Sequence, residues 1–267
     1  MTLIMGIVNV TPDSFSDGGR YLDPDAAIAH ARFLRDQGAD LLDVGGESTR
    51  PGAQRVAPRV EQQRVLPVVE ALASEGAFVS IDTMNAVTAV AAVRAGARLV
   101  NDVSGGLADP DMLAAVAETD AELALGHWRG PSTEMYARAD YADVGREVAA
   151  ELAARVEAAL AAGIAPTRIV VDPGIGFGKR GAQNWQTLRA LPEIAGLGHR
   201  VLIGTSRKRF LAEVLGDDAD LGRRDLATAV TSALAARDGA WAVRVHDVPT
   251  TRDALAVARA FTDAGES

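Results

Sequence analysis

Short apolar segments recur along the whole chain, and a small, polar or charged residue stands at or just past the end of nearly every one. Each segment is almost continuously apolar, which is typical of strands in a parallel sheet covered on both faces. The segments are Leu3–Val10, Leu41–Val44, Phe78–Ile81, Leu99–Val103, Leu123–Leu125, Ile169–Val171, Val201–Ile203 and Ala242–Val245. Helix-like stretches separate them, so the pattern predicts eight strand–helix units.

Eight alternating strands and helices are typical of a (β/α)8 (TIM) barrel, an α/β fold of about 250 residues. The chain has 267 residues, and it contains no linker or low-complexity tract that would divide it. We therefore expect one barrel domain over residues 1–267. In such barrels the active site lies at the carboxyl ends of the strands, so the fold also predicts where the chemistry takes place.

Three of the intervening helices have clear sequence signals. Asp23 and Pro24 supply an N-cap and a proline in the first turn. Apolar residues repeat every four positions between 144 and 160, as on one face of a helix. Thr250 and Asp253 resemble a capping box before the apolar residues Leu255, Ala258 and Phe261.

Composition excludes several classes of function. The formal net charge of −9 argues against nucleic acid or an anionic membrane as the main partner. No apolar run approaches the ~18 residues of a membrane span, and the chain opens directly into the first predicted strand, so we expect no signal peptide. With no cysteine and four histidines, disulfides are excluded and a zinc cluster is disfavoured. We expect a cytoplasmic protein with small-molecule partners.

One set of polar residues stands at the ends of three different predicted strands. These residues are Asp82, Asn101 and Asp172. Strand ends converge at the mouth of a barrel, so the three side chains are expected to face one ligand. Carboxylates and an amide suit a heterocycle with adjacent N–H donors. The alternative is that each residue caps the turn that follows it, which is more common for any one of them taken alone.

Lysine is scarce in this chain. Lys179 and Lys208 are the only lysines among 27 basic Lys and Arg residues. A lysine retained among arginines can supply a compact point charge, which a guanidinium cannot, although chance retention is an equal alternative. Lys208 follows the seventh predicted strand and is expected to donate to a carbonyl or ring nitrogen of the ligand.

A second set follows the first and last predicted strands, which become neighbours when a barrel closes. Asn9, Arg244 and His246 combine an amide oxygen with cationic and imidazole donors. This combination suits a diphosphate with an oxygen-bound Mg²⁺. A helix-capping or core role is the alternative for His246.

A glycine-rich segment, Gly174–Lys179, invites comparison with phosphate-binding loops. Pro173 and Arg180 break the Walker pattern, and the third glycine comes one residue too early for a dinucleotide fingerprint. We reject both interpretations. The segment is better explained as a turn that lets Phe177 lie against a flat ligand, with a simple tight turn as the alternative.

Seven segments together resemble the dihydropteroate synthase family, and the match runs from Met5 to about Ala260. These segments are MGIVNVTPDSFSDGG (Met5–Gly19), DVGGESTRPGA (Asp43–Ala53), SIDT (Ser80–Thr83), NDVSGG (Asn101–Gly106), DPGIGFGK (Asp172–Lys179), GTSRKRF (Gly204–Phe210) and RVHDV (Arg244–Val248). The resemblance implies a barrel transferase of folate biosynthesis. It would condense 6-hydroxymethyl-7,8-dihydropterin diphosphate with p-aminobenzoate, require Mg²⁺, form a homodimer through late barrel helices and be a sulfonamide target.

The resemblance also implies residue roles. It assigns the pterin to Asp82, Asn101, Asp172 and Lys208, with Phe177 and Gly204 lining the slot. It assigns Mg²⁺ to Asn9, and the diphosphate to Thr49, Arg244 and His246. It assigns the closing loops and the p-aminobenzoate pocket to Asp17, Thr49, Arg50, Pro51, Ser206 and Arg207. The residues expected to act in the reaction itself are Asp17, Asp82, Lys208, Arg244 and His246.

The chain departs from the family at Gly126, where a methionine usually precedes His127. A methionine that packs on the pterin would be missing. Two alternatives remain open from the sequence: a methyltetrahydrofolate methyltransferase and a catalytically silent pterin-binding paralogue. The first has no need of the Asn9, Arg244 and His246 set.

Overall fold

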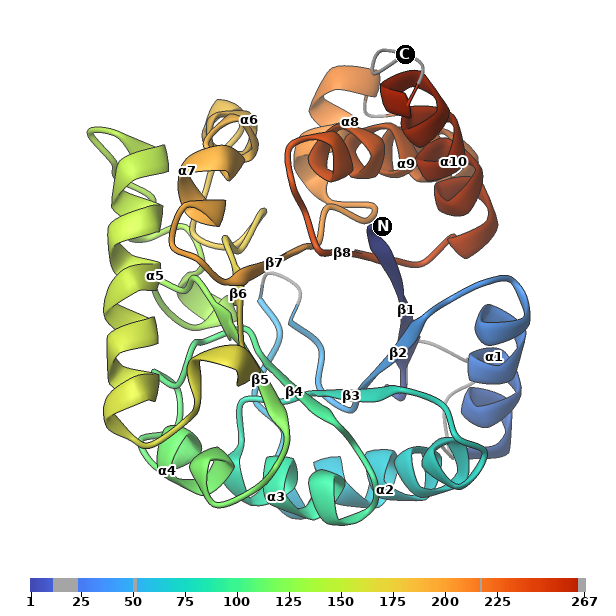
Figure 1. Ribbon diagram of the computed structural model, residues 1–267, viewed down its shortest axis with the longest axis vertical. Helices are drawn as coiled ribbons and strands as arrows, with labels where there is room; N and C mark the ends of the chain where they lie inside the picture. Colours follow the sequence, from blue (N-terminus) through green and yellow to red (C-terminus); the bar gives the residue numbers. More distant parts are fainter. Residues whose placement is uncertain (12–23, 50–51, 217, 264–267) are drawn as a thin grey trace.

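A closed parallel barrel forms the centre of the protein (Figure 1). The computed structural model describes residues 1–11, 24–49, 52–216 and 218–263. Within these residues eight strands pair in chain order, and β1 pairs with β8 to close the barrel. The strands are β1 (Leu3–Asn9), β2 (Leu41–Gly45), β3 (Val79–Asp82), β4 (Leu99–Asp102), β5 (Glu122–Gly126), β6 (Ile169–Asp172), β7 (Arg200–Ile203) and β8 (Ala242–Val245).

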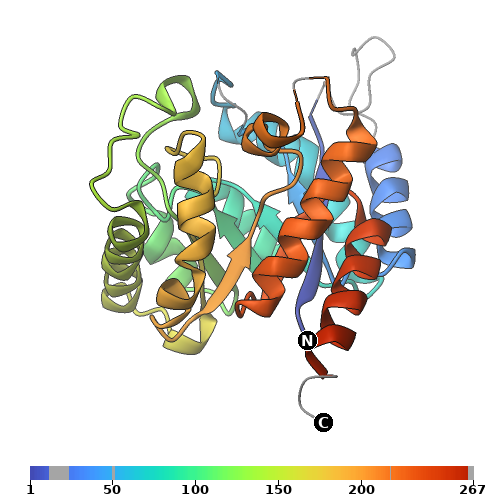
Figure 2. The same cartoon turned by 90° about the horizontal axis from the view of Figure 1, so that it is seen from above.

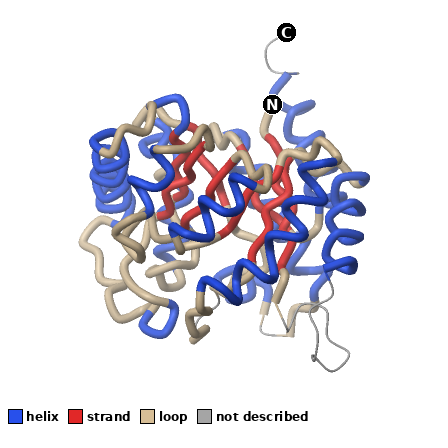
Figure 3. The backbone as a smooth tube through the Cα atoms, turned by 90° about the horizontal axis from the view of Figure 1, so that it is seen from below, coloured by secondary structure: helices blue, strands red, loops and turns tan. Residues whose placement is uncertain are grey.

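Helices surround the barrel and cover its outer face (Figures 1 and 3). The helices are α1 (Pro24–Asp36), α2 (Pro58–Ser74), α3 (Ala86–Arg94), α4 (Met112–Ala117), α5 (Val144–Ala161), α6 (Ala182–Arg189), α7 (Leu191–Ala195), α8 (Arg209–Leu215), α9 (Leu221–Arg237) and α10 (Val248–Asp263), with short 3-10 turns at Ser132–Glu134 and Pro166–Arg168. None of these described helices combines the length and hydrophobicity that a bilayer span requires.

The predicted fold is confirmed: the protein is a single (β/α)8 barrel. The near-continuous hydrophobicity of the strands follows from their position, because one face packs on the helices and the other fills the barrel. Every predicted apolar segment overlaps a strand, and the one at Ala242–Val245 coincides with β8.

The capping box predicted at Thr250 and Asp253 is wrong, because the cap of the last helix lies earlier in the chain. Helix α10 begins at Val248. Asp247 provides the capping group, because its carboxylate accepts hydrogen bonds from the Thr250 amide (3.1 Å) and the Thr250 hydroxyl (2.7 Å). Thr250 is thus a donor to the cap inside the helix.

Strand register brings the polar residues of the first strands to one level. Asn9 pairs with Gly45, Gly45 with Asp82, and Asp82 with Asn101. On the other side of the barrel Gly126 pairs with Asp172. All strands run in the same direction, so these residues share the end of the barrel toward which the β7 arrow points in Figure 2.

Candidate active site

A polar layer lies directly above an apolar layer inside the barrel. The apolar layer is a separate cluster of buried residues: Met5, Leu41, Leu99, Ala124, Val170, Leu202 and Ala242. Residues two positions apart on a strand point to the same face. The next inward positions toward the carboxyl ends are therefore Ile7, Asp43, Asn101, Gly126, Asp172, Gly204 and Arg244. This change from apolar to polar marks the floor of the candidate site.

One half of the site is built around the Arg244 guanidinium. Its Nε donates to Asp43 Oδ2 at 2.5 Å, and a terminal nitrogen donates to Asp82 Oδ2 at 2.8 Å. Asn101 Nδ2 donates to the same Asp43 oxygen at 3.0 Å. Asp43 is completely buried, and its Oδ1 finds no hydrogen-bond partner among the described residues. A single fixed carboxylate thus orients one side chain from each predicted set.

Asp82 is a buried carboxylate that shares one guanidinium with Asp43. Burial raises the pKa of Asp82 to about 7; Arg244 lowers it, and the nearby Asp43 raises it further. Two buried carboxylates that share one cation cannot both be fully compensated. The Asp82 carboxylate can therefore also accept hydrogen bonds from a ligand or stabilise positive charge on it.

The other half of the site contains Asp172 and Lys208. Asp172 Oδ1 accepts a hydrogen bond from the Gly174 amide at 2.7 Å. Lys208 Nζ makes a short hydrogen bond to the Ile175 carbonyl and lies 4.5 Å from the centre of the Phe177 ring. Burial lowers the pKa of Lys208 to about 8, against the raising effect of Asp172. A carboxylate, an ammonium and an aromatic face thus line one slot.

The two halves belong to one site. Arg244 lies close enough to lower the pKa of both Asp172 and Lys208. Asp82 in turn raises the pKa of Lys208. A Cβ placed on Gly204 would lie 3.8 Å from both the Arg244 Cβ and the Lys208 Nζ. Gly204 therefore lies next to both the Arg244 side chain and the Lys208 ammonium.

His246 and Ser206 form a pair beside this site. The Ser206 hydroxyl lies 2.8 Å from His246 Nδ1, and the His246 amide donates to the same oxygen at 3.1 Å. The serine thus fixes the orientation of the imidazole. The sequence interpretation assigned Ser206 to the p-aminobenzoate pocket and did not include this hydrogen bond.

Arg207 is committed to a neighbouring helix. Its guanidinium makes a bidentate pair with Asp225 of α9 at 2.7 and 2.8 Å, and its amide donates to the Thr228 hydroxyl. Its φ of +57° is the left-handed conformation that L residues rarely adopt. The structure thus connects the loop after β7 to α9.

The remaining predicted site residues stand at the end of β1 or follow β1 and β2 in the sequence. Asn9 is half-buried at the end of β1, and the Thr49 carbonyl accepts a hydrogen bond from the Ser132 hydroxyl at 3.4 Å. Asp17, Arg50 and Pro51 lie outside the described residues.

Gly126 has no room for a side chain. A Cβ at this position would lie 2.4 Å from the Val103 carbonyl oxygen and 2.6 Å from the Val103 Cα, both of which are backbone atoms. The backbone after β4 therefore occupies the space into which a side chain at position 126 would extend. The ends of strands β4 and β5 thus approach closely at Gly126.

We expect Gly126→Ala to destabilise the protein by about 1–3 kcal/mol, because a methyl group there overpacks against fixed backbone. Urea unfolding at one pH measures this difference. Gly222→Ala on α9 is the matched control, since its added Cβ meets only an ordinary contact at 3.6 Å. If Gly126→Ala is as stable as the wild type, the Val103 backbone can move to accommodate the methyl group, and the predicted overpacking is wrong.

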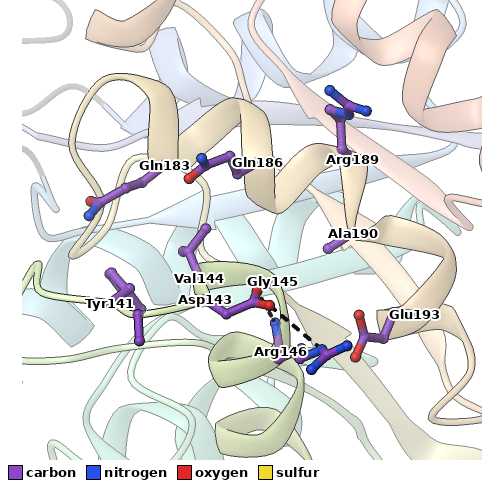
Figure 4. A pocket seen from close by; sticks show the side chains of 11 residues that line it. Tyr141, Asp143, Val144, Gly145, Arg146, Gln183, Gln186, Arg189, Ala190 and Glu193 are labelled. Atoms are coloured by element: carbon purple, nitrogen blue, oxygen red, sulfur yellow. Dashed lines mark hydrogen bonds and ion pairs between the residues drawn. The ribbon is translucent and has the colours of Figure 1, made fainter.

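A cleft of 520 Å³ lies outside the barrel, between the start of α5 and helices α6 and α7 (Figure 4). Its lining includes Tyr141, Arg146, Gln183, Arg189 and Glu193. None of the predicted site residues lines it. The candidate site is therefore the barrel mouth, not this cleft.

Sequence reasoning missed Asp43, although a signal was present. Asp43 is the only charged residue within the apolar segment Leu41–Val44. A charge inside a buried strand needs a partner, and the period-two pattern aims it at the same interior as Arg244. The sequence alone does not identify that partner, because it lies 201 positions away.

Comparisons with known proteins agree with this geometry. Residues 5–246 match the family described as pterin binding enzyme. The dihydropteroate synthase of Mycobacterium leprae is 53% identical, covering 98% of this chain and 94% of the relative. The Xanthomonas albilineans dihydropteroate synthase solved with 4-aminobenzoic acid superposes with a TM-score of 0.91 at 45% identity, covering 98% of this chain and 93% of that one. The same enzyme in complex with 7,8-dihydropteroate gives 0.87 at 43% identity, covering 98% of this chain and 94% of that one. On this evidence, the chain belongs to the dihydropteroate synthase family of pterin-binding enzymes.

Proposed function

We propose that this chain condenses 6-hydroxymethyl-7,8-dihydropterin diphosphate with p-aminobenzoate, giving 7,8-dihydropteroate and pyrophosphate. The observation that carries the proposal is the division of one barrel mouth into two halves. Asp172 and Lys208 suit a flat heterocycle, and Arg244 with its two carboxylates lies beside them. The dihydropteroate synthases of Mycobacterium leprae and a Synechocystis species match this chain over 94% and 90% of their own lengths.

In this proposal the pterin ring occupies the Asp172 half. The Asp172 carboxylate accepts ring N–H bonds, and its Oδ1 keeps the Gly174 amide as well because each oxygen carries two lone pairs. Lys208 donates to a ring carbonyl or nitrogen, and Phe177 packs against the ring face. Asn101, held through its Nδ2 by Asp43, presents its carbonyl oxygen as an acceptor.

The diphosphate occupies the Arg244 and His246 half, with Thr49 at its outer edge. No three His, Asp or Glu side chains of the described residues gather to hold a metal ion. Mg²⁺ suits this site only if the diphosphate supplies most of the ligands, since one or two protein oxygens then suffice. The Asn9 carboxamide at the end of β1 fits that need. A bound Mg²⁺ would neutralise charge on the leaving diphosphate.

The reaction needs no protein nucleophile. The bond between the pterin methylene carbon and the diphosphate oxygen breaks, and the p-aminobenzoate nitrogen forms the new bond and loses a proton. Asp82 lies where positive charge on the ring can be stabilised, while Arg244 and His246 stabilise the departing anion. We assign the p-aminobenzoate pocket to Ser206 and Arg207, together with Asp17, Arg50 and Pro51, which lie outside the described residues. Exclusion of water from this pocket prevents a competing hydrolysis. Sulfonamides, as p-aminobenzoate analogues, compete in that pocket, and the reaction takes place in the cytoplasm.

A turnover assay tests the function. The chain is incubated with dihydropterin diphosphate, p-aminobenzoate and Mg²⁺, and dihydropteroate and pyrophosphate are quantified. Equal amounts of both products are expected, with loss of turnover in EDTA and recovery on adding Mg²⁺. Pterin binding without turnover would instead favour the silent paralogue.

We further propose a homodimer through α9 and α10. These helices lie side by side (Figure 1) and share an exposed apolar surface. Its residues are Leu226, Val230, Leu234, Val257 and Phe261, between 45% and 78% exposed. The spacing of four residues within each helix places them on one face of that helix. A contiguous apolar face of this kind is typical of a self-complementary interface.

We expect the wild type to sediment as a dimer and Val230→Glu to sediment as a monomer at the same concentration, because the charge is buried in the interface. Sedimentation equilibrium measures both. Val87→Glu is the matched control, since Val87 is an exposed valine (60%, against 50% for Val230) on α3, across the barrel from α9. A monomeric wild type, or a Val230→Glu variant that remains dimeric, would contradict this interface.

A further inference from the structure

Lys179 is a completely buried ammonium outside the set of proposed ligand contacts. Only 1% of the residue is exposed, which makes it the largest fully buried side chain among the described residues. Its Nζ lies 2.9 Å from His127 Nδ1, and it donates to the Gly174 carbonyl at 3.0 Å and to the Phe177 carbonyl at 3.1 Å. An ammonium has three N–H donors, and here each of them has an acceptor.

His127 accepts from this lysine in its neutral form. Its Nε2 lies 3.0 Å from Glu151 Oε2, so the partners favour the tautomer in which Nε2 donates to Glu151 and Nδ1 accepts from Lys179. Burial and the Lys179 charge lower the pKa of His127 to about 4. The imidazole therefore stays neutral at pH 7 and remains an acceptor.

The two carbonyls that Lys179 holds belong to the turn that lines the pterin slot. Gly174, Gly176 and Gly178 have φ values of 63°, 83° and 59°, which direct the carbonyls of this turn to both of its sides. The carbonyls of Gly174 and Phe177 accept from Lys179, and the Ile175 carbonyl between them accepts from Lys208. The two lysines of the chain thus hold the same turn from opposite sides.

We propose that Lys179 is a positioning residue for the pterin slot: its ammonium ties the Gly174 and Phe177 carbonyls to His127, and so fixes the turn that presents Phe177 and orients Lys208. The inference rests on the proposed function, because it names what holds the ring-binding half of that site. His127 completes the connection, since its own amide donates to the Asp172 carbonyl at 2.8 Å.

The geometry requires a lysine at this position. Three acceptors surround one nitrogen atom within 3.1 Å, which suits the tetrahedral ammonium. The planar guanidinium of arginine spreads its donors over three nitrogens and cannot converge on one point. This accounts for a second lysine in a chain that otherwise uses arginine.

The first test compares Lys179→Met with a matched control, Arg168→Met. Arg168 also donates to two backbone carbonyls, those of Ala121 (2.8 Å) and Val116 (3.0 Å). It precedes β6, however, whereas the Gly174–Phe177 turn follows β6, so Arg168 lies at the far end of that strand. We expect Lys179→Met to raise KM for the pterin diphosphate about tenfold and to leave KM for p-aminobenzoate within about twofold at saturating pterin substrate. We expect Arg168→Met to lower stability without this split.

The second test restores the ammonium chemically. The chain has no cysteine, so Lys179→Cys carries a single thiol. Alkylation in urea with 2-bromoethylamine gives an S-aminoethyl side chain of lysine length, and 1-bromopropane gives its neutral isostere. After refolding, the charged form is expected to recover the wild-type KM for the pterin diphosphate, and the neutral form is not. The wild type carried through the same treatment is the control for refolding.

Equal KM values for the pterin diphosphate in the charged and neutral alkylated forms would overturn the role of Lys179. A Lys179→Met variant in which KM for the pterin diphosphate and KM for p-aminobenzoate change by the same factor would also overturn it. If Lys179→Met does not fold, His127→Leu removes one of the three acceptors and is expected to shift the same KM in the same direction; an unchanged KM overturns the proposal. Failure of the proposed function is distinguishable, because the wild type itself would then give no dihydropteroate.

Discussion

Arg244→Ala is expected to reduce kcat/KM for the pterin diphosphate by about 10²–10³-fold or more, the range for loss of one electrostatic contact to developing charge. The same change is expected to weaken binding of the pterin product much less, because the product carries no diphosphate. The structure adds a second consequence: Asp43 and Asp82 lose their common cation. Steady-state kinetics and product calorimetry measure the two effects separately.

The control for this prediction is Asp43→Asn, which keeps the shape of the side chain and leaves the guanidinium in place. It removes the negative charge that anchors Arg244 Nε, so a smaller loss in the same kinetic constant is expected. If Arg244→Ala weakens binding of the diphosphate substrate and binding of the pterin product by the same factor, Arg244 has a structural role only.

Asp172→Ala is expected to weaken pterin binding by about 2–4 kcal/mol, because paired hydrogen bonds to a charged acceptor are lost. Asp172→Asn is the more specific variant, since its amide oxygen can still accept from the Gly174 amide while the negative charge opposite Lys208 is gone. Calorimetry with pteroate measures both variants.

Asp102→Asn is the matched control for Asp172. Asp102 is also a buried carboxylate at a strand end, but it accepts from the Ser104 and Gly106 amides and caps its own turn. We expect it to lower stability and leave pteroate affinity unchanged. An Asp172→Ala variant with wild-type pteroate affinity would remove Asp172 from the pterin site.

The sequence predicted the fold because the relevant signals are local. Apolar segments of strand length alternate with helical periodicity, and the barrel rule then sets the order and direction of the strands. The capping residue of α10 was predicted wrongly because Thr250 and Asp247 are both of a capping type, and only the backbone geometry decides which one accepts.

The site was predictable to the extent that strand ends converge. That rule indicated Asp82, Asn101 and Asp172 together, but it gave no pairing between them. Asp43 was missed because its partner is distant in sequence, and the space at Gly126 depends on how closely Val103 approaches. The role of Lys179 likewise depends on three acceptors that only the folded turn brings together.

The most direct measurement is a crystal structure of the chain with Mg²⁺ and the fully oxidised pterin diphosphate, which resists turnover. We expect one molecule to bridge the mouth, with its ring on Asp172 and its phosphates on Arg244 and His246. A ligand whose ring and phosphates both lie away from these residues, for example in the outer cleft beside α5, would contradict the assignment.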